Sequence, residues 1–468
     1  MKMHFCIPVS QQQPDSLGGS YVLYSVYLDG FLFCKVRYSQ LHRWNEQLRR
    51  VFGNCLPPFP PKHYLAMTTA MAQERRDQLE RYLQNVTADP LVTRSDVFTE
   101  FLTLVQMHTL NITTKKTALA VFLPNGRSIT VEVLTSDTAE RVLQVVPGRE
   151  WHGRLGLYPE LLGYFGLFLI RCFPEGKLSV VKKLADFELP YSSLQHSEVQ
   201  DCKVGLRKWY LDPALDSLLM DCRAAGDLLY MQILQGIELD WVKPTQAQRE
   251  ELTALQEKEN QRQFLELSQE VRHYGYIQLD PCTCNHPEPG CEAVLSIGNN
   301  EISCCVTLPN GQTQDITFQM SGVKCWQVTF LGSLLNTAGP QRTLNQNLEL
   351  RFQYSEDDHQ PWFVIYTKQA FFLSSCLKKM ISEKMAKVAE ENPEMQIEVP
   401  EQDKSKKQPN QSENWTKGVF ACKFRKDVAC FKCFKTLGDK DRSKFDADEC
   451  VLCYGVEWLA QSVVLRSL

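Results

Sequence analysis

The sequence predicts an α+β protein of several domains, and three observations lead to this prediction. Its 468 residues exceed the length of one typical domain and suggest about two to four. Up to residue 390, segments with the alternating pattern of strands and segments with helical spacing follow one another. Beyond residue 390 the composition becomes polar and then apolar and rich in cysteine, which indicates a linker followed by a separate tail.

Residues 1–107 are predicted to form a first compact α+β domain. Residues 4–38 are rich in β-branched and aromatic residues, with Asp29-Gly30 as a hairpin turn between strands. The proline-rich run 56–62 cannot be helical and should cross the domain in an extended form. Apolar residues at helical spacing predict helices over 39–52, 69–87 and 91–106.

Residues 115–205 have the element order of a ubiquitin-like lobe. A hairpin around Asn125-Gly126 is followed by a helix and by further strands at 165–172 and 178–182. Asp137, with Glu140 three residues later, forms the capping-box pattern that predicts the start of this helix. Residues 206–273 are mostly helical by periodicity and should form a second lobe, with helices over 215–235 and over the charged stretch 245–272.

Residues 274–390 are predicted to form a β-sandwich of the PTB or pleckstrin type, closed by one helix. From Tyr276 onward the apolar residues alternate, which is typical of strands. The closing helix should cover residues 367–388. The expected strands cover 301–308, 315–320, 323–330, 348–354 and 362–366.

The C-terminal part is predicted to be a disordered linker, 391–418, and a cysteine-rich tail, 419–468. The tail contains two Cys-x-x-Cys pairs separated by 16 residues, which is the spacing of a four-thiolate zinc site. The alternative is a C-terminus without selected structure. We therefore keep zinc as a candidate only and expect no metal or other cofactor. The candidate ligands are Cys430, Cys433, Cys450 and Cys453.

The overall composition excludes several classes of protein. A net charge of −4 argues against general nucleic-acid binding. The N-terminus lacks the apolar core of a signal peptide, and the longest apolar stretch, 161–170, is about half a membrane span. We therefore expect a soluble, cytosol-facing protein whose 18 cysteines are reduced thiols. Phosphate-binding loops, nucleophile elbows and zinc-protease motifs are all missing from the sequence, so we do not expect an enzyme.

Basic residues recur at three separated places in the first domain: Arg37 beside Tyr38, Lys62 after the prolines, and Arg75 in the second helix. A small headgroup that carries several phosphates needs separate cations around one pocket and an aromatic face under its ring. The simpler alternative is that the cations lie on the surface and Tyr38 packs in the core. The joint pattern favours the pocket.

These motifs carry a resemblance to a known family. Arg37-Tyr38, Pro57-x-x-Pro60-x-Lys62, and Arg75 four residues before Leu79 make residues 4–106 similar to PX domains that bind phosphatidylinositol 3-phosphate. Residues 115–388 resemble a FERM-like module of ubiquitin-like, helical and PTB-like lobes. PX followed by FERM is the arrangement of a small group of sorting nexins, and the chain resembles its 17/31 branch. The motifs shared with that branch include Gly163-Tyr-Phe165, Arg272-His-Tyr-Gly-Tyr276 and Cys325-Trp326. The residues after 390 do not match the tail expected from that branch.

The resemblance implies distinct roles in the lipid pocket. Arg37 would bind the 3-phosphate, Tyr38 would pack against the inositol ring, Lys62 would face the 1-phosphate, and Arg75 would reach the ring hydroxyls. Residues that follow Lys62 could insert into the membrane interface, although ordinary packing is an equal alternative. The candidates for insertion are Tyr64, Leu65 and Met67.

The PTB-like lobe implies a second binding site. In this branch its groove takes Asn-Pro-x-Tyr or Asn-x-x-Tyr motifs from the cytoplasmic tails of receptors or integrins, paired as an added strand. Residues 323–330 would be the edge strand, with Trp326 as the aromatic anchor, although a tryptophan is more often a core residue. The candidate groove residues are Lys324, Cys325, Trp326, Val328, Phe372 and Cys376.

Taken together, the resemblance implies an adaptor that is peripheral on early endosome membranes, reads the lipid and the cargo tail, and promotes recycling. The alternative is a membrane-tethered scaffold for a small Ras-like GTPase that binds no cargo. Some members recruit the endosomal recycling machinery through an acidic tail. Because this chain ends without acidic residues, that partner is in doubt.

Overall fold

The computed structural model describes residues 3–15, 19–62, 68–150, 159–195, 199, 201–331, 347–354, 362–391 and 451–455. The predicted insertion residues Tyr64, Leu65 and Met67 lie outside these ranges, as do the linker from residue 392 and the cysteines 430, 433 and 450. Cys453 belongs to a short strand whose backbone alone is described.

The N-terminal domain is an antiparallel sheet covered by helices. Strands β1 (Phe5–Pro14), β2 (Ser20–Leu28) and β3 (Phe31–Arg37) form a three-stranded meander. Asp29 and Gly30 have φ values of 51° and 82°, as in the type I′ turn that the sequence predicts. Helices α1 (Tyr38–Phe52), α2 (Thr69–Val86), α3 (Pro90–Thr93) and α4 (Asp96–Leu110) follow. Trp44, Tyr24 and Tyr82 are among the buried residues that fill the core.

The first lobe has a five-stranded mixed sheet in the order β5-β4-β8-β6-β7, in which β4 and β8 are parallel. Its strands are β4 (Lys116–Phe122), β5 (Ser128–Leu134), β6 (Phe165–Cys172), β7 (Leu178–Lys183) and β8 (Cys202–Lys208), with helices α5 (Ala139–Glu150) and α6 (Pro190–Gln195). The predicted cap of α5 was one residue early. Thr138 accepts from the backbone N–H of Arg141, whereas Asp137 accepts from that of Leu134.

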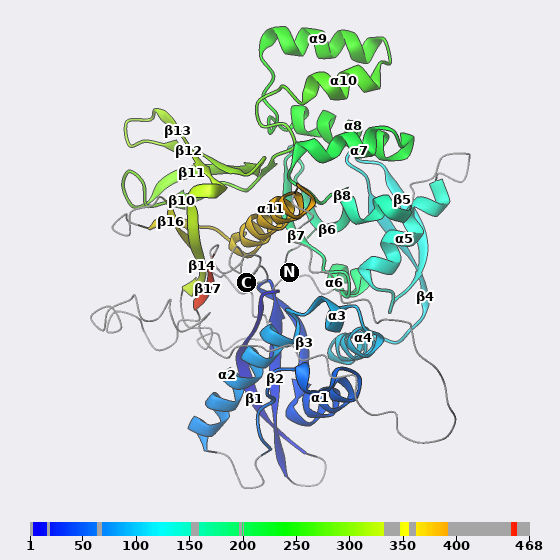
Figure 1. Cartoon of the computed structure of the whole chain (residues 1–468), viewed down its shortest axis with the longest axis vertical. Helices are drawn as coiled ribbons and strands as arrows, with labels where there is room; N and C mark the ends of the chain where they lie inside the picture. The colour runs from blue at the N-terminus through cyan, green and yellow to red at the C-terminus, as the bar shows by residue number, and fades with distance from the viewer. Residues whose placement is uncertain are drawn as a thin grey trace, which may run out of the picture.

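The second lobe is helical, as predicted, and comprises α7 (Asp216–Met220), α8 (Arg223–Glu238), α9 (Gln246–Glu257) and α10 (Gln261–Ser268). The charged stretch expected over 245–272 is not one helix. It breaks after Lys258, where Glu259 has a φ of 53° and the Asn260 side chain caps α10. Helices α9 and α10 stand at the far end of the molecule from the N-terminal domain (Figure 1).

The third lobe contains one long antiparallel path of strands and a long helix. The order is β13-β12-β11-β10-β16-β15-β14-β17, with β9 paired to β11. Helix α11 (Ala370–Glu391) packs against β14 and β15. The strands are β9 (Ile277–Gln278), β10 (Cys282–Cys284), β11 (Cys291–Gly298), β12 (Glu301–Thr307), β13 (Thr313–Gln319), β14 (Val323–Leu331), β15 (Asn347–Tyr354), β16 (Phe363–Tyr366) and β17 (Val451–Gly455).

The N-terminal domain and the lobes pack directly on one another (Figure 1). Phe187 of the first lobe belongs to the core of the N-terminal domain, where it stacks on Phe5 at 6.3 Å between ring centroids. The buried amide of Gln106 on α4 donates to the carbonyl of Phe187 and accepts from the backbone N–H of Leu189. The sheets and helices of the N-terminal domain and the three lobes confirm the predicted α+β, multidomain fold class.

Candidate functional site

The corner between β3 and α1 positions the first two residues of the predicted lipid pocket. Arg37 is the last residue of β3 and Tyr38 the first residue of α1, so the two side chains lie where the backbone turns from strand to helix. The Gln40 side chain accepts from the backbone N–H of Arg37 at 2.8 Å and fixes this corner. The guanidinium carbon of Arg37 lies 3.3 Å from the ring centroid of Tyr21, a cation–π contact.

The proline-rich crossing, which ends at Lys62, contacts both Tyr38 and Arg75. The hydroxyl of Tyr38 donates to the carbonyl of Pro60 at 2.8 Å, and Arg75 Nη2 contacts the carbonyl of Pro61 at 3.5 Å. The guanidinium carbon of Arg75 lies 4.4 Å from the ring centroid of Tyr38. Lys62 directly follows these prolines and is exposed. Tyr38, Arg75 and the crossing therefore form one cluster, with Lys62 at its rim.

Arg75 is an unusual residue for a helix surface because only 7% of it is exposed. Its Nε is buried and has no hydrogen-bond partner among the residues that the structure describes. A buried guanidinium with an unfilled donor carries a desolvation cost that an anionic or hydroxyl-bearing ligand relieves. This is the feature of the cluster that points most directly to a ligand.

Two tyrosines near the predicted pocket were not predicted from the sequence, and both lie on β2. The ring of Tyr21 makes the cation–π contact with the guanidinium of Arg37. Tyr24 is fully buried in the core, and the neighbouring Arg75 lowers the pKa of its hydroxyl, against the larger upward effect of burial. The sequence signal for Tyr21 is its position two residues before Leu23, which pairs with Arg37 across the hairpin. That register can be derived only if a bulge between Val26 and Tyr27 is known.

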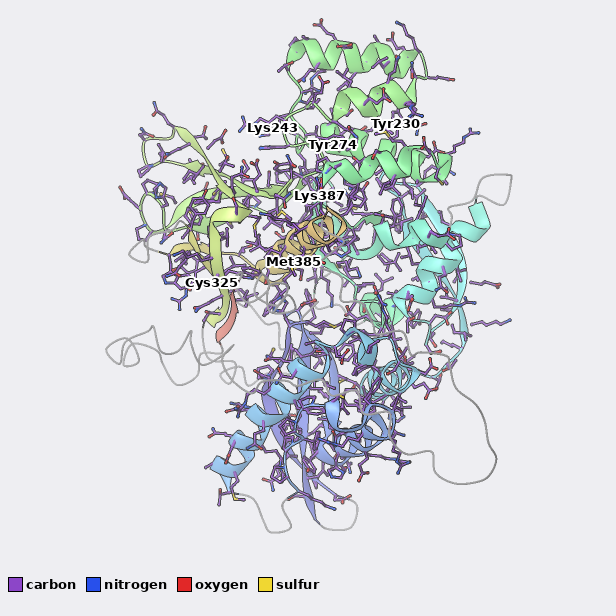
Figure 2. The ribbon with its side chains drawn as sticks, viewed as in Figure 1. Tyr230, Lys243, Tyr274, Cys325, Met385 and Lys387 are labelled. Carbon is purple, nitrogen blue, oxygen red and sulfur yellow. The ribbon has the colours of Figure 1, made fainter. Side chains whose placement is uncertain are left out.

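In the third lobe, most of the predicted groove residues are packed inside. Trp326 is fully buried, and its indole Nε1 donates to Ser374 Oγ on α11 at 2.7 Å. Lys324 and Cys325 are half-buried, and Cys325 lies on β14 beside the short strand β17 (Figures 1 and 2). The remaining predicted residues, Val328, Phe372 and Cys376, are also buried. The ring of Phe372 on α11 packs against Phe168 and Trp209, with ring centroids 6.5 and 6.4 Å away, and so faces the first lobe.

A segment of the C-terminal tail occupies the edge of β14. Strand β17 pairs with it in antiparallel register, from Cys325 opposite Gly455 to Thr329 opposite Val451. Without these five residues, β14 would be an end strand of the path described above. No strand was predicted over residues 451–455 from the sequence. The pairing demonstrates that the backbone of β14 can accept an added extended segment.

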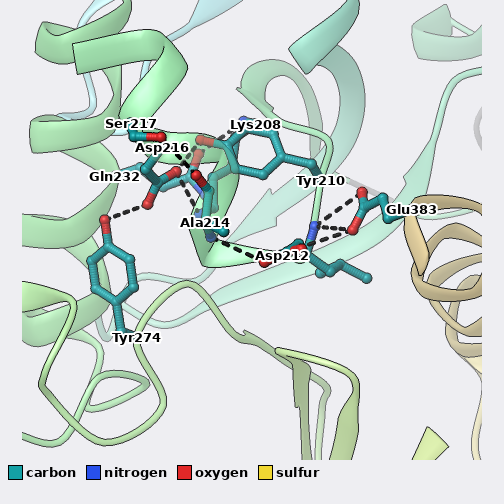
Figure 3. Close-up of polar contacts among 10 residues, drawn as sticks. Lys208, Tyr210, Asp212, Ala214, Asp216, Ser217, Gln232, Tyr274 and Glu383 are labelled. Carbon is teal, nitrogen blue, oxygen red and sulfur yellow. Dashed lines mark hydrogen bonds and ion pairs between the residues drawn. The ribbon is translucent and has the colours of Figure 1, made fainter. Parts of the chain in front are cut away.

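A buried polar cluster fixes α11 relative to the first two lobes (Figure 3). Asp216, which is fully buried, accepts from the hydroxyls of Tyr210 and Tyr274, and Lys208 Nζ lies 3.6 Å from it. Burial, together with the neighbouring Asp216 carboxylate, raises the pKa of Tyr274. On the α11 side, the Glu383 carboxylate accepts from the backbone N–H groups of Leu211 and Asp212, each at 3.0 Å. The wall of the predicted groove is therefore anchored at its C-terminal end.

The described residues contain neither a membrane-spanning helix nor a cluster of metal ligands. Within the described ranges, no helix has the length and apolar character needed to cross a bilayer. Likewise, no group of three or more potential metal ligands occurs in those ranges, and they exclude most of the tail that holds the candidate zinc cysteines.

Comparison with known protein families gives matches along most of the chain. A profile of the PX domain matches residues 32–104. Three profiles then match in order: the sorting nexin 17/27/31 FERM F1 lobe over 117–211, the sorting nexin 17/31 FERM F2 lobe over 212–272, and the sorting nexin 17 FERM C-terminal domain over 275–385. The expected succession of PX domain and FERM lobes is confirmed.

Individual relatives agree with these matches. Sorting nexin-31 of Mus musculus is 83% identical over 411 residues, which cover 88% of this chain and 92% of that protein. Sorting nexin-31 of Homo sapiens is 70% identical over 451 residues, 96% of this chain and 98% of that protein. Sorting nexin-17 of Homo sapiens is 41% identical over 391 residues, 82% of each.

The human match bears on the C-terminal region. An alignment of 451 residues that covers 96% of the chain must extend past residue 390. This relative therefore shares at least part of the region after residue 390, whereas the alignment with human sorting nexin-17 covers 391 residues.

Proposed function

The chain belongs to the 17/31 branch of the sorting nexins, a family of non-enzymatic adaptors, and on that premise we propose that it is an endosomal sorting adaptor. In this proposal the PX domain binds phosphatidylinositol 3-phosphate on early endosome membranes. The third FERM lobe binds Asn-Pro-x-Tyr or Asn-x-x-Tyr motifs in the tails of transmembrane receptors or integrins, and the complex promotes their recycling.

The observation that carries the lipid half is the buried Arg75 with its unfilled Nε, seated beside the ring of Tyr38. In the proposed complex, Arg37 binds the 3-phosphate and Tyr38 supports the inositol ring. Lys62 faces the 1-phosphate from the rim, and Arg75 binds the ring hydroxyls. The segment of Tyr64, Leu65 and Met67, which follows Lys62, is proposed to insert into the membrane interface.

The cargo half is supported by the pairing of β17 with β14. An edge that accepts one extended segment in antiparallel register offers the same backbone donors and acceptors to a peptide. We assign contact with the peptide to Lys324 and Cys325, which retain exposed surface. Trp326 and Val328, with Cys376 of α11, then shape the wall from inside. Phe372 takes no part in this wall, because its ring packs against the first lobe. A cargo peptide that pairs here has to displace β17.

The lipid half is tested with vesicles of phosphatidylcholine that contain or lack phosphatidylinositol 3-phosphate. The whole chain should bind the first kind and not the second. Arg37→Ala should weaken this binding about 100-fold or more, because charge-assisted hydrogen bonds to a phosphate contribute about 1.5–3 kcal/mol each and a bidentate Arg37 would make two. Cosedimentation measures the difference.

The matched control is Arg43→Ala, which removes an exposed cation from α1 outside the cluster. It should leave binding nearly unchanged. An equal loss of lipid binding in both variants would mean that binding depends only on net charge. It would rule out a specific headgroup pocket.

A further inference from the structure

The side chain of Arg37 lies against an aromatic ring from the neighbouring strand. Its guanidinium carbon is 3.3 Å from the ring centroid of Tyr21, whereas cation–π contacts extend to about 6 Å. At this distance an edge-on guanidinium would place a nitrogen inside the van der Waals radius of the ring carbons, so the two planes lie face to face. For comparison, the guanidinium carbon of Arg75 is 4.4 Å from the ring centroid of Tyr38.

The register of the hairpin explains how Tyr21 reaches Arg37. Arg37 is the last residue of β3 and pairs with Leu23 of β2. Tyr21 lies two residues before Leu23, so its side chain leaves the same face of the sheet as that of Arg37. At this level β3 has ended, whereas β2 continues and pairs with β1, with Tyr21 opposite Gln13. The ring therefore lies diagonally across from Arg37, a separation that an aromatic and a long side chain can bridge.

The contact occupies one face of the guanidinium and leaves its edges accessible. All five N–H groups of an arginine point outward in the plane of the guanidinium, away from a ring that lies under its face. These in-plane donors are the groups that bind a phosphate through two parallel hydrogen bonds. Because Tyr21 is uncharged, it also holds the cation without neutralising it, as a carboxylate partner would.

We infer that Tyr21 is a positioning residue for Arg37: its ring holds the guanidinium flat, so that the in-plane donors face the 3-phosphate site before the lipid binds. This role rests on the proposed lipid function and deepens it. The backbone of Arg37 is fixed separately, by the side chain of Gln40. Without the ring, Arg37 spends a smaller fraction of the time in the binding orientation, and the apparent affinity falls by that fraction.

The test measures how strongly the whole chain prefers vesicles with phosphatidylinositol 3-phosphate over vesicles with unphosphorylated phosphatidylinositol. Tyr21→Leu keeps an apolar side chain on β2 and removes the ring. It should reduce the preference about 3- to 10-fold, the size of one cation–π contact. Tyr21→Met is a second variant without a ring and should show the same loss. Tyr21→Phe has a ring without the hydroxyl and should recover most of the preference. Cosedimentation measures all three.

The matched control is Val22→Ala. Val22 is the next residue of β2, so its side chain leaves the opposite face of the strand, and it packs against the core of the PX domain. The shorter side chain should lower the melting temperature of the whole chain and leave the lipid preference unchanged. If Tyr21 served only the stability of the strand, Tyr21→Leu would behave like this control.

The outcomes separate this inference from the proposed function. An unchanged chain that does not prefer the vesicles with the 3-phosphate overturns both. If the unchanged chain has the preference, the role of Tyr21 is overturned when the variants without a ring keep it, or when Tyr21→Phe loses as much as they do. An equal loss in Val22→Ala also overturns this role, because the packing of β2 would then be the cause. In these last three cases the lipid proposal stands.

Discussion

Arg75 shows how far single residues could be assigned from sequence alone. Its place in the motif, four residues before Leu79, predicted a headgroup contact, but not that only 7% of the residue is exposed. Burial of an arginine depends on what packs over it, here the proline crossing and Tyr38. Tyr21 was missed for a related reason. The bulge in the β2–β3 hairpin shifts the register by one residue, and only the shifted register places Tyr21 on the side of Arg37.

The position of Trp326 could not be predicted from the alternation of apolar and polar residues, because its strand shows little alternation. From Trp326 to Thr329 every residue of β14 is buried, so the two faces of the strand cannot be distinguished by hydrophobic pattern. The indole also has a hydrogen-bond partner inside the protein, Ser374. Its part in peptide binding therefore remains a proposal about the shape of the wall.

Asp29 gives a prediction about pH. Burial raises the pKa of this turn carboxyl from 3.8 to about 6, against the opposing effect of Lys182 and Lys378. Because the folded value exceeds the unfolded one, the acid contributes stability at low pH, and this contribution is lost as the pH rises through about 6. Asp29→Asn, which also tolerates the φ of 51°, should therefore gain stability over the unchanged chain as the pH rises.

The free energy of unfolding that Asp29→Asn gains over the unchanged chain should be on the order of 1 kcal/mol larger at pH 7.5 than at pH 5. Urea unfolding at the two pH values measures it. Asp186→Asn is the control, because that side chain is 74% exposed and pairs with Lys183 at the surface. A difference for Asp29→Asn that is the same at both pH values would show that the carboxyl does not titrate in this range.

At the scale of elements, the strands and helices that carry strong local signals were predicted well, and the exceptions have local causes. The hairpin at Asp29-Gly30 forms as expected because both residues accept positive φ. The break between α9 and α10 was missed because helical periodicity continues across it, although Asn260 supplies a cap. Strand β17 was missed because its only described partner, β14, lies more than 100 residues earlier in the chain.

The pairing of β17 with β14 predicts that the tail and a cargo peptide compete. Leu452→Pro should weaken β17, because proline cannot donate to a strand ladder. The variant should bind an Asn-Pro-x-Tyr peptide about 3- to 30-fold more tightly than the unchanged chain, since less of the β14 edge is occupied. Isothermal titration of the whole chain measures the affinity.

Leu452→Ala serves as the comparison, because it shortens the same side chain and keeps the backbone donor. It should change the affinity less than the proline variant does. Equal peptide affinity in all three chains would mean that the peptide does not pair with the edge that β17 covers.

At the scale of the whole molecule, the junction between the PX domain and the FERM lobes was beyond sequence reasoning. Phe187 follows β7 in the first lobe and reads as an ordinary apolar residue, yet it completes the core of the PX domain. Gln106 bonds across the same junction from α4. Contacts between domains depend on surfaces that no local pattern specifies. They hold the PX domain and the FERM lobes together, so the proposed lipid site and the β14 edge belong to one body.

This arrangement leads to the central claim, that the chain reads a lipid and a cargo tail together. Two contacts on one membrane raise each other's effective concentration, and the gain is largest when their separation is fixed. Neither site needs high affinity alone. The alternative, a scaffold without cargo, predicts no contribution from the peptide.

The most direct test uses vesicles that carry phosphatidylinositol 3-phosphate, a membrane-anchored Asn-Pro-x-Tyr peptide, both, or neither. The whole chain should bind vesicles that carry both at least about tenfold more tightly than vesicles that carry either one. Arg37→Ala should reduce this binding to the level of the peptide alone. Binding to the combined vesicles that is no tighter than to the better single kind would rule out joint recognition of the lipid and the cargo tail.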